Sequence, residues 1–350
     1  MTSRLKKCIL VVLASLMVLQ MWGPYATAGP AASRSLRSNP PDEMVQRYEE
    51  WIGQYGRVYS NETEKAQRFR VFRDNAMFID SFNQAGNQSF TLAINEFADL
   101  TNQEFRSTRL GYIAPPPSGV TTPFIYENIT ALPPTVDWLK SGAVTPIKNQ
   151  EQCGCCWAFS TVAATEGLTK ITTGKLISLS EQQLVDCDHI SHGCNGGWMQ
   201  AGFKYITENN GITTEENYPY VMAQGPCQQN KASAMAARLG GFVNVPQNSE
   251  ADLMKAVAHQ PVSVSIDAAG QEMQFYAGGI FTAACSTIIN HGVTAIGYGT
   301  DPAGTKYWLI KNSWGPNWGE QGYLRLLKDN GVPEGICGIA TQASFPLPAK

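Results

Sequence analysis

Hydrophobic and polar positions recur with different periods in successive parts of the chain. Between Asp42 and Asn83, helix-forming residues carry an apolar stripe, which predicts a helix with one shared face. Helical patterns return from Leu132 to about Asn210, and from Gly240 onward short apolar and aromatic runs alternate with glycine turns, which predicts β-strands. Together these patterns predict an α+β fold. The shared face of the first segment consists of Glu64, Arg68, Phe72, Asn75, Ile79 and Asn83.

A segment without periodicity separates the two folded parts. Residues 111–131 contain the run Pro115-Pro116-Pro117-Ser118-Gly119, a composition that favours extended, exposed chain open to proteolysis. We therefore expect a helical N-terminal domain over about 42–100, a proline-rich processing linker over about 111–131, and a larger domain over 132–350.

The first 28 residues predict a secretory signal peptide. Met1–Lys7 carries three basic residues, Ile9–Leu19 is apolar, and Ala26-Thr27-Ala28 offers small residues for cleavage. The apolar run is shorter than the roughly 20 residues that cross a bilayer, so we expect no membrane anchor, with a retained anchor as the alternative. A secreted or acidic-compartment protein of the vacuolar or lysosomal kind is therefore expected. Three acceptor sequons for N-glycosylation agree with this route, at Asn61, Asn87 and Asn128.

Composition changes this picture little. Of the 350 residues, 43% are hydrophobic and 16% are charged, so the chain can bury a core and does not resemble a disordered protein. The formal charge is −3, and neither half is strongly basic. Nucleic acid is therefore not an expected partner.

The cysteines leave two arrangements open. Eight of the nine follow residue 152, and in an oxidising compartment they could form four disulfides, or three disulfides with one reactive thiol and one left over. A zinc site built from Cys153, Cys155, Cys156 and neighbouring histidines lacks a paired C-x2-C spacing. We expect no metal.

One cysteine stands where a nucleophile is favoured. The run Gln150 to Ser160 passes from a polar turn with Gly154 into the helical pattern Trp157–Gly167, which places Cys156 at a helix N-terminus. Unpaired backbone N–H groups and the helix dipole stabilise a thiolate there. The alternative is a buried or disulfide-bonded cysteine.

Two downstream motifs add a base and an orienting residue. Asn290-His291-Gly292 precedes an apolar run, and Lys311-Asn312-Ser313-Trp314-Gly315 follows the strand-like run Tyr307–Ile310. With the motif around Cys156, and in this order, the chain resembles the papain family of cysteine peptidases, of the plant type. The resemblance extends over nearly the whole chain after the signal peptide.

The resemblance implies a papain-like fold of two subdomains, a helical left one and a β-barrel-like right one, with catalysis between them. It makes Cys156 the nucleophile of a thioester mechanism and His291 its proton partner, held as a thiolate and imidazolium pair. It makes Asn312 the residue that orients His291, and gives the Gln150 amide and the backbone N–H of Cys156 the oxyanion hole. No cofactor is implied.

The resemblance also implies a substrate pocket. Backbone groups of Gly197 would pair with an extended peptide, and the glycines allow that close approach. The pocket for the second residue before the cleaved bond should prefer an apolar or aromatic side chain, although Trp198 and Met199 could instead be core residues. The residues implied at these positions are Gly196, Gly197, Trp198, Met199, Ser265, Ile289, Gly292 and Gln342.

The resemblance chooses one disulfide connectivity, namely Cys153–Cys194, Cys187–Cys227 and Cys285–Cys337. Cys155 is then an unpaired thiol beside the nucleophile, where the family more often has serine or alanine. Glu151 also departs, from a common glycine. These departures support the rival hypothesis of a catalytically weak or inactive storage or defence protein on the same scaffold.

The N-terminal part resembles the family's inhibitory pro-region, which implies a zymogen over residues 29–131. Acidification would weaken carboxylate contacts, with Asp99 a candidate trigger, and the mature chain would begin near Leu132 or Pro133. An endopeptidase is expected, because no paired-histidine insertion follows Gly193. Expected partners are peptide or protein substrates, the chain's own pro-region and cystatin-type protein inhibitors, and we expect a monomer.

Overall fold

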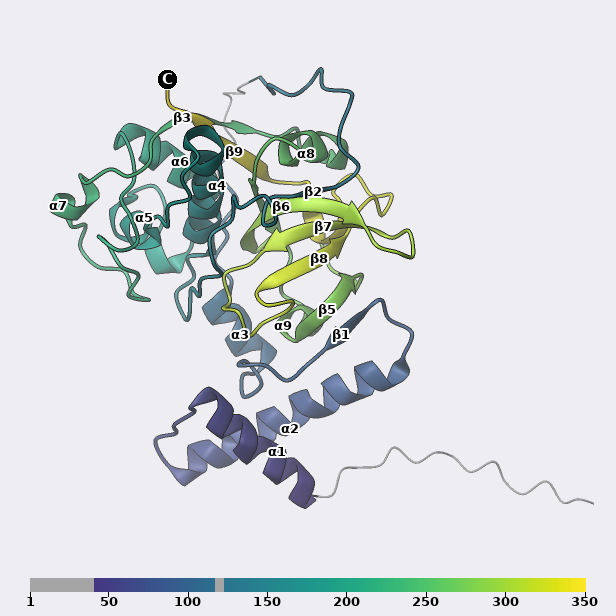
Figure 1. Cartoon of the computed structure of the whole chain (residues 1–350). Helices are drawn as coiled ribbons and strands as arrows, with labels where there is room; N and C mark the ends of the chain where they lie inside the picture. Colours follow the sequence, from purple (N-terminus) through teal and green to yellow (C-terminus); the bar gives the residue numbers. More distant parts are fainter. Residues whose placement is uncertain (1–40, 117–122) are drawn as a thin grey trace, which may run out of the picture.

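The N-terminal part of the chain is helical in the computed structural model, which describes residues 41–116 and 123–350. Helices α1 (Pro41–Tyr55) and α2 (Glu62–Ala85) lie together below the rest of the molecule in Figure 1, and α3 (Asn102–Arg109) leads up from them. The single helical stretch expected here is broken at Gly56, which takes a left-handed backbone. The predicted signal peptide lies outside the described residues.

The predicted face of α2 holds this part together. Phe72, Asn75 and Ile79 are buried along the helix, and Phe72 packs against Tyr48 and Trp51 of α1 with ring centroids 5.1 and 5.3 Å apart. The side-chain amide of Asn75 donates to the carbonyl oxygens of Ala98 and Leu100 at 2.8 and 2.9 Å. The remaining members of the stripe connect α2 to the chain that follows it, since Arg68 pairs with Glu104 and Asn83 bonds Leu92.

A long buried helix organises the next part. Helix α4 (Cys156–Thr173) carries buried residues on nearly every side of its first four turns. Around it lie α5 (Glu181–Cys187), the short 3-10 turn Gly193–Asn195, α6 (Met199–Glu208) and α7 (Gln229–Ala232). Both apolar packing and buried polar contacts hold this helix, since the Ser160 hydroxyl donates to the carbonyl of Val293 at 2.7 Å and Glu166 accepts from the Thr145 hydroxyl at 2.6 Å.

The remainder is dominated by one nine-stranded sheet, shown beside the helices in Figure 1. The order along it is β1, β5, β8, β7, β6, β4, β9, β3, with β2 paired to β6. The α+β class is as predicted, and α8 (Glu250–Val257), α9 (Gln271–Gln274) and a 3-10 turn at Ile336–Gly338 interrupt the strands. The strands are β1 (Phe90–Leu92), β2 (Val136–Asp137), β3 (Leu239–Asn244), β4 (Val262–Ile266), β5 (Tyr276–Phe281), β6 (His291–Thr300), β7 (Lys306–Lys311), β8 (Tyr323–Leu327) and β9 (Ala343–Pro348).

The N-terminal part is attached to this sheet as an edge strand. Strand β1 pairs antiparallel with β5, with Phe90 opposite Gly279. Asn95 donates from its side-chain amide to the carbonyl of Gln274 at 2.8 Å, and Gln271 donates to Asn75 at 3.0 Å. Backbone pairing and buried amides therefore dock the two parts in one register.

Three disulfides are present, and they join the same cysteines that the resemblance implies: Cys153–Cys194, Cys187–Cys227 and Cys285–Cys337. The two cysteines without a disulfide in the described chain are Cys155 and Cys156, both buried. The side chains of the three sequon asparagines are exposed, and Asn61 caps α2 by accepting from the backbone N–H of Glu64. Within the ranges described, no helix is both long and apolar enough to cross a membrane.

The linker is exposed along most of its described length, as predicted, but two of its aromatic side chains pack on the rest of the fold. Tyr112 is buried, and Tyr126 stacks on His259 with ring centroids 4.2 Å apart and lies against Phe345. Composition predicts how a segment behaves when nothing packs against it. Here residues distant in the sequence, His259 and Phe345, form a surface on which Tyr126 packs.

Candidate active site

Cys156 lies where the helical part meets the sheet. It is the first residue of α4, as predicted, and Cys155 before it has non-helical backbone angles. The Cys156 sulfur accepts a hydrogen bond from the backbone N–H of Gly292 in β6 at 3.3 Å. The thiol thus sits at a helix N-terminus and touches the strand that begins with His291.

The imidazole of His291 is oriented by Asn312. Nε2 of His291 lies 2.8 Å from Oδ1 of Asn312. The same oxygen accepts the backbone N–H of Ser313 at 2.8 Å, which identifies it as an acceptor and Nε2 as the donor. Strands β6 and β7 are neighbours, so the histidine that opens one and the asparagine that follows the other meet. Nδ1 is left as the nitrogen that can exchange a proton.

Trp314 covers this pair. Its ring stacks on His291 with centroids 4.5 Å apart, and it is fully buried. Phe97 and Phe105 of the N-terminal part meet the tryptophan edge-on at 6.2 and 5.0 Å. The hydrogen bond from His291 to Asn312 is therefore shielded from water.

Gln150 is fixed on both sides of its amide group. Oε1 accepts from the Ser313 hydroxyl at 2.7 Å, and the Gln150 backbone oxygen accepts from the Tyr220 hydroxyl at 2.7 Å. Nε2 donates to the backbone oxygens of Arg109 and Cys153, both at 3.0 Å. A donor aimed at a carbonyl oxygen is the geometry that an oxyanion hole needs.

Residues 109–113 of the N-terminal part run across this site. The N–H of Gly197 donates to the carbonyl of Gly111 at 2.9 Å, and the N–H of Ile113 donates to the carbonyl of Gly197 at 2.9 Å. Tyr112 donates from its backbone to Asn290 at 3.0 Å. A Cβ atom on Gly111 would lie 1.9 Å from the carbonyl oxygen of Gly154, so only glycine fits there. Backbone pairing with Gly197 therefore does occur, with the chain's own segment as the strand.

This covering segment changes the protonation of the site. Burial lowers the pKa of His291 to about 4, which the hydrogen bond to Asn312 offsets only in part. Burial raises the pKa of Cys156 from its ordinary 9.0 to about 11, against several backbone hydrogen bonds. In the covered precursor, burial therefore disfavours the charged form of both groups, the Cys156 thiolate and the His291 imidazolium. The reason is desolvation, because both side chains are completely covered.

The implied pocket residues gather around one aromatic side chain. Tyr112 is buried in the same apolar cluster as Met199, with Trp198 and Ile289 packed against it. Ser265 and Gln342 join across strands at this edge, since the Ser265 N–H donates to the Gln342 carbonyl at 3.1 Å. Met199 is fully buried and Trp198 partly so. Gly196 and Gly292 have neighbours within 3.4 Å of an added Cβ, so both admit close contact.

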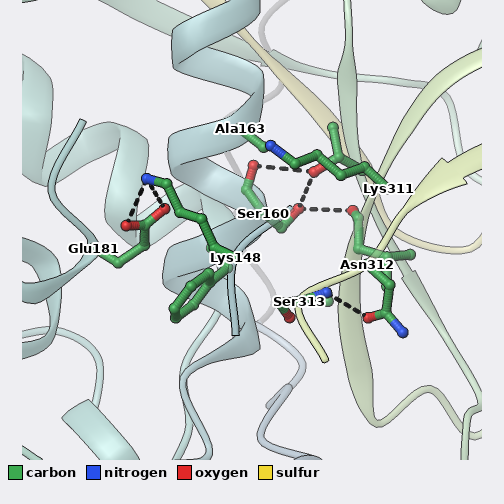
Figure 2. A pocket seen from close by; sticks show the side chains of 11 residues that line it. Lys148, Ser160, Ala163, Glu181, Lys311, Asn312 and Ser313 are labelled. Carbon is green, nitrogen blue, oxygen red and sulfur yellow. Dashed lines mark hydrogen bonds and ion pairs between the residues drawn. The ribbon is translucent and has the colours of Figure 1, made fainter. Parts of the chain in front are cut away.

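A buried ionic cluster beside the site gave no signal in the sequence. Lys148 reaches Glu181 at 2.7 Å and Glu166 at 3.2 Å, and Lys311 lies 3.9 Å from Glu166 and donates to Thr145 at 2.7 Å. Figure 2 shows Lys148 and Glu181 on one side of a small cavity, with Asn312 and Ser313 on the other. Burial raises the pKa of Glu181, while Lys148 and Lys311 hold that of Glu166 low despite burial.

The two departures from the family pattern leave the site intact. The Cys155 sulfur points to the Tyr220 hydroxyl at 3.1 Å, and burial raises its pKa. Glu151 has a left-handed backbone, with φ of 52°, and its side chain accepts from Asn149 at 2.8 Å. Neither side chain displaces Gln150 or Cys156.

In residues 41–116 and 123–350, no group of three or more acidic, histidine or cysteine side chains is placed to hold a metal ion.

Comparison with known proteins agrees with this geometry. The protein-family model described as "Papain family cysteine protease" matches residues 132–347 of this chain. The family model described as "Cathepsin propeptide inhibitor domain (I29)" matches residues 48–105. The "Senescence-specific cysteine protease SAG39" of Oryza sativa subsp. indica is 56% identical over 309 residues, 87% of this chain and 90% of the relative. "Vignain" of Vigna mungo is 46% identical over 351 residues, 98% of this chain and 94% of the relative.

Solved structures give the same result for the fold. The structure titled "Recombinant stem bromelain precursor" superposes with a TM-score of 0.82 at 43% sequence identity, covering 88% of this chain and all of that one. Both family domains, the precursor fold and the arrangement around Cys156 thus coincide in one molecule. The chain belongs to the papain family of cysteine proteases and carries the family's propeptide inhibitor domain.

Proposed function

We propose that this protease precursor matures in the secretory pathway into an endopeptidase that cleaves peptide bonds through a thioester on Cys156. The observation that carries the proposal is the segment already seated in the site. It places a backbone carbonyl, that of Arg109, 3.0 Å from Nε2 of Gln150 and lays Gly111 against Gly197 beside the thiol. The site thus receives an extended peptide backbone and directs a donor at its carbonyl.

The reaction follows from the roles of four side chains. Once water re-enters, Cys156 transfers its proton to His291, and the thiolate attacks the substrate carbonyl while Gln150 and the Cys156 N–H stabilise the oxyanion. The sulfur–carbon bond forms, the carbon–nitrogen bond breaks, and His291 gives its proton to the leaving amine. Water then attacks the thioester, His291 takes the water proton, and the sulfur–carbon bond breaks. Because Nε2 of His291 donates a hydrogen bond to Asn312, Nδ1 is the nitrogen that accepts and returns these protons.

We infer an apolar or aromatic preference at the second residue before the cleaved bond. Tyr112 is buried in the apolar cluster that also contains Met199. Trp198 and Ile289 pack against that cluster, and no carboxylate is among the implied pocket residues. A substrate side chain of similar size and polarity gains the same burial.

Covering of the site by residues 109–113 supports inhibition by the chain's own pro-region until it is cut. We place the mature start near Leu132 or Pro133 and the destination in an acidic vacuole- or lysosome-like compartment or outside the cell. We also propose glycans on Asn61, Asn87 and Asn128, a monomeric enzyme, and cystatin-type inhibitors as partners.

The test uses the full precursor and its Cys156→Ala variant, both brought to about pH 4 to 5. Intact mass and cleavage of peptides with an apolar second residue are followed in the same samples. We expect only the wild type to lose its pro-region and gain activity. If the wild type fails to cleave peptides even after another protease removes the pro-region, the proposed function is wrong.

A further inference from the structure

Glu151 stands on the side of the site that receives the leaving group. Tyr112 and Ile113 lie with Gly197 on the acyl side of the thiol. The covering segment passes the thiol at Gly111 and reaches the opposite side at Arg109, whose carbonyl binds Gln150, the neighbour of Glu151. The side chains of Arg109 and Glu151 meet there, with Nη1 and Oε2 3.8 Å apart.

The mature domain itself holds the Glu151 carboxylate in place. The backbone N–H of Glu151 donates to Oδ1 of Asn149 at 3.0 Å, and Nδ2 of Asn149 donates to Oε1 of Glu151 at 2.8 Å. A non-glycine residue with φ of 52° carries a cost that this pair of hydrogen bonds offsets. The carboxylate is therefore oriented before any ligand arrives, with Oε2 left to face one.

The arginine now opposite Glu151 interacts with two carboxylates, that of Glu151 in the mature domain and that of Glu96 in the pro-region. Its side chain is 4% exposed, and Nε and Nη1 have no hydrogen-bond partner among the described residues. Its guanidinium lies over Phe97 at 5.0 Å. When the pro-region leaves, Arg109 and Phe97 leave with it, whereas Glu151 and Asn149 remain. A carboxylate adjacent to the oxyanion-hole glutamine is then free.

We propose that Glu151 forms a subsite of the mature enzyme that selects arginine or lysine at the second residue after the cleaved bond. The inference rests on the proposed peptidase function. The seated segment forms a parallel bridge with Gly197, and Arg109, two residues before Gly111 at the thiol, lies at Glu151. A substrate that runs in the opposite direction to this segment therefore places its second residue after the cleaved bond at Glu151. The guanidinium of a substrate would pair with Oε2 while its backbone passes Gln150.

The test compares peptides that are identical except for arginine, glutamine or glutamate at that position. For the mature wild type we expect kcat/KM for arginine to exceed that for glutamine by up to about fivefold, the upper end for a partly exposed carboxylate pair. Glutamate should be disfavoured further, and 0.5 M salt should reduce the differences. In Glu151→Gln and Glu151→Gly, the ratio of arginine to glutamine should fall to about one. Glycine suits the left-handed backbone, so this second variant keeps the fold.

Matched controls separate this inference from the proposed function. Glu208→Gln removes an exposed carboxylate at the far end of α6 and should keep the wild-type ratio. A substrate with an apolar second residue and a small fluorogenic leaving group has nothing to place at Glu151, so its hydrolysis reports only the peptidase function. Fluorescence anisotropy then measures how tightly the same peptides bind to mature Cys156→Ala. The ratio of their dissociation constants gives the preference for arginine over glutamine without catalysis. A ratio near one in the wild type, or one that survives Glu151→Gln, overturns the inference even where the fluorogenic substrate is cleaved.

Discussion

The precursor should protect Cys156 from alkylation by two separable effects. A pKa of about 11 instead of 9.0 leaves about one hundredth of the usual thiolate at pH 7. The thiol is also completely covered, so iodoacetamide can react only when residues 109–113 lift away. Both effects come from burial of the thiol, and we expect the precursor thiol to react at least about a hundredfold slower than that of the mature enzyme.

Tyr112→Ala should release much of this protection. The phenol ring is 6% exposed and packs in the pocket of Met199, and losing its burial costs about 2 kcal/mol or more. If lifting of the segment precedes reaction, a loss of about 2 kcal/mol raises the open fraction, and with it the alkylation rate, about thirtyfold. The rate is measured by intact mass at pH 7.

Two controls make the outcome decisive. Ile125→Ala changes a linker side chain that is 53% exposed, and should leave the rate unchanged. Cys156→Ala reports any reaction at Cys155, which is buried against Tyr220 and should contribute little. Equal rates for the wild type and Tyr112→Ala would refute the argument, because the ring would then carry no part of the closure.

Three further predictions concern other parts of the precursor. Lys148→Met should lower the free energy of unfolding by about 3 to 5 kcal/mol, because it strands buried carboxylates, whereas Glu181→Gln should cost clearly less. Urea unfolding measures both, and equal losses would contradict the cluster's assigned charges. Asn312→Ala should lower kcat/KM of the mature enzyme about ten- to a hundredfold with little change in KM, since it frees Nε2 of His291. If Asn312→Ala left the pH profile and the rate unchanged, a contact other than the one with Asn312 would fix the tautomer of His291. Glu104→Gln should flatten the loss of precursor Tm as the pH falls below about 4.5, measured in the Cys156→Ala background that cannot cut itself, because the lowered pKa of Glu104 lies in that range. An unaltered slope there would rule out this carboxylate.

The sequence predicted those features that depend on local pattern or on motif order. Cys156 opens a helix because a turn runs directly into an apolar helical pattern, and His291 and Asn312 border strands that their flanking residues already indicated. The strands that bring these motifs together have separate positions in the chain, so their meeting followed only from the family resemblance.

What the sequence did not predict depends on surfaces made by distant residues. Gly111 lies in a space bounded by the backbone of Gly154, and Tyr112 in a pocket built from two halves of the fold. The composition of the linker gives no information about either of these surfaces, because residues elsewhere in the chain form them. The same holds for Lys148, whose partners come from separate helices and whose charge in the sequence looks like that of any surface lysine.

The proposed acid activation has to act through carboxylates whose charged form the folded pro-region stabilises, and the raised pKa of Asp99 argues against Asp99 as one of them. Burial raises the pKa of Asp99, so its folded form binds a proton more readily than the unfolded chain, and acidification relieves a cost. Glu96 behaves in the same way. Burial also opposes the charge of Glu104, but hydrogen bonds from Thr101 and the pair with Arg68 outweigh it and lower its pKa below 4.5. The contribution of ionised Glu104 to the stability of the folded precursor is complete above about pH 4.5. It is lost as the pH falls through the lowered pKa of Glu104 in the folded state. Because Glu104 joins α3 to α2, its protonation loosens the helix that leads residues 109–113 into the active site.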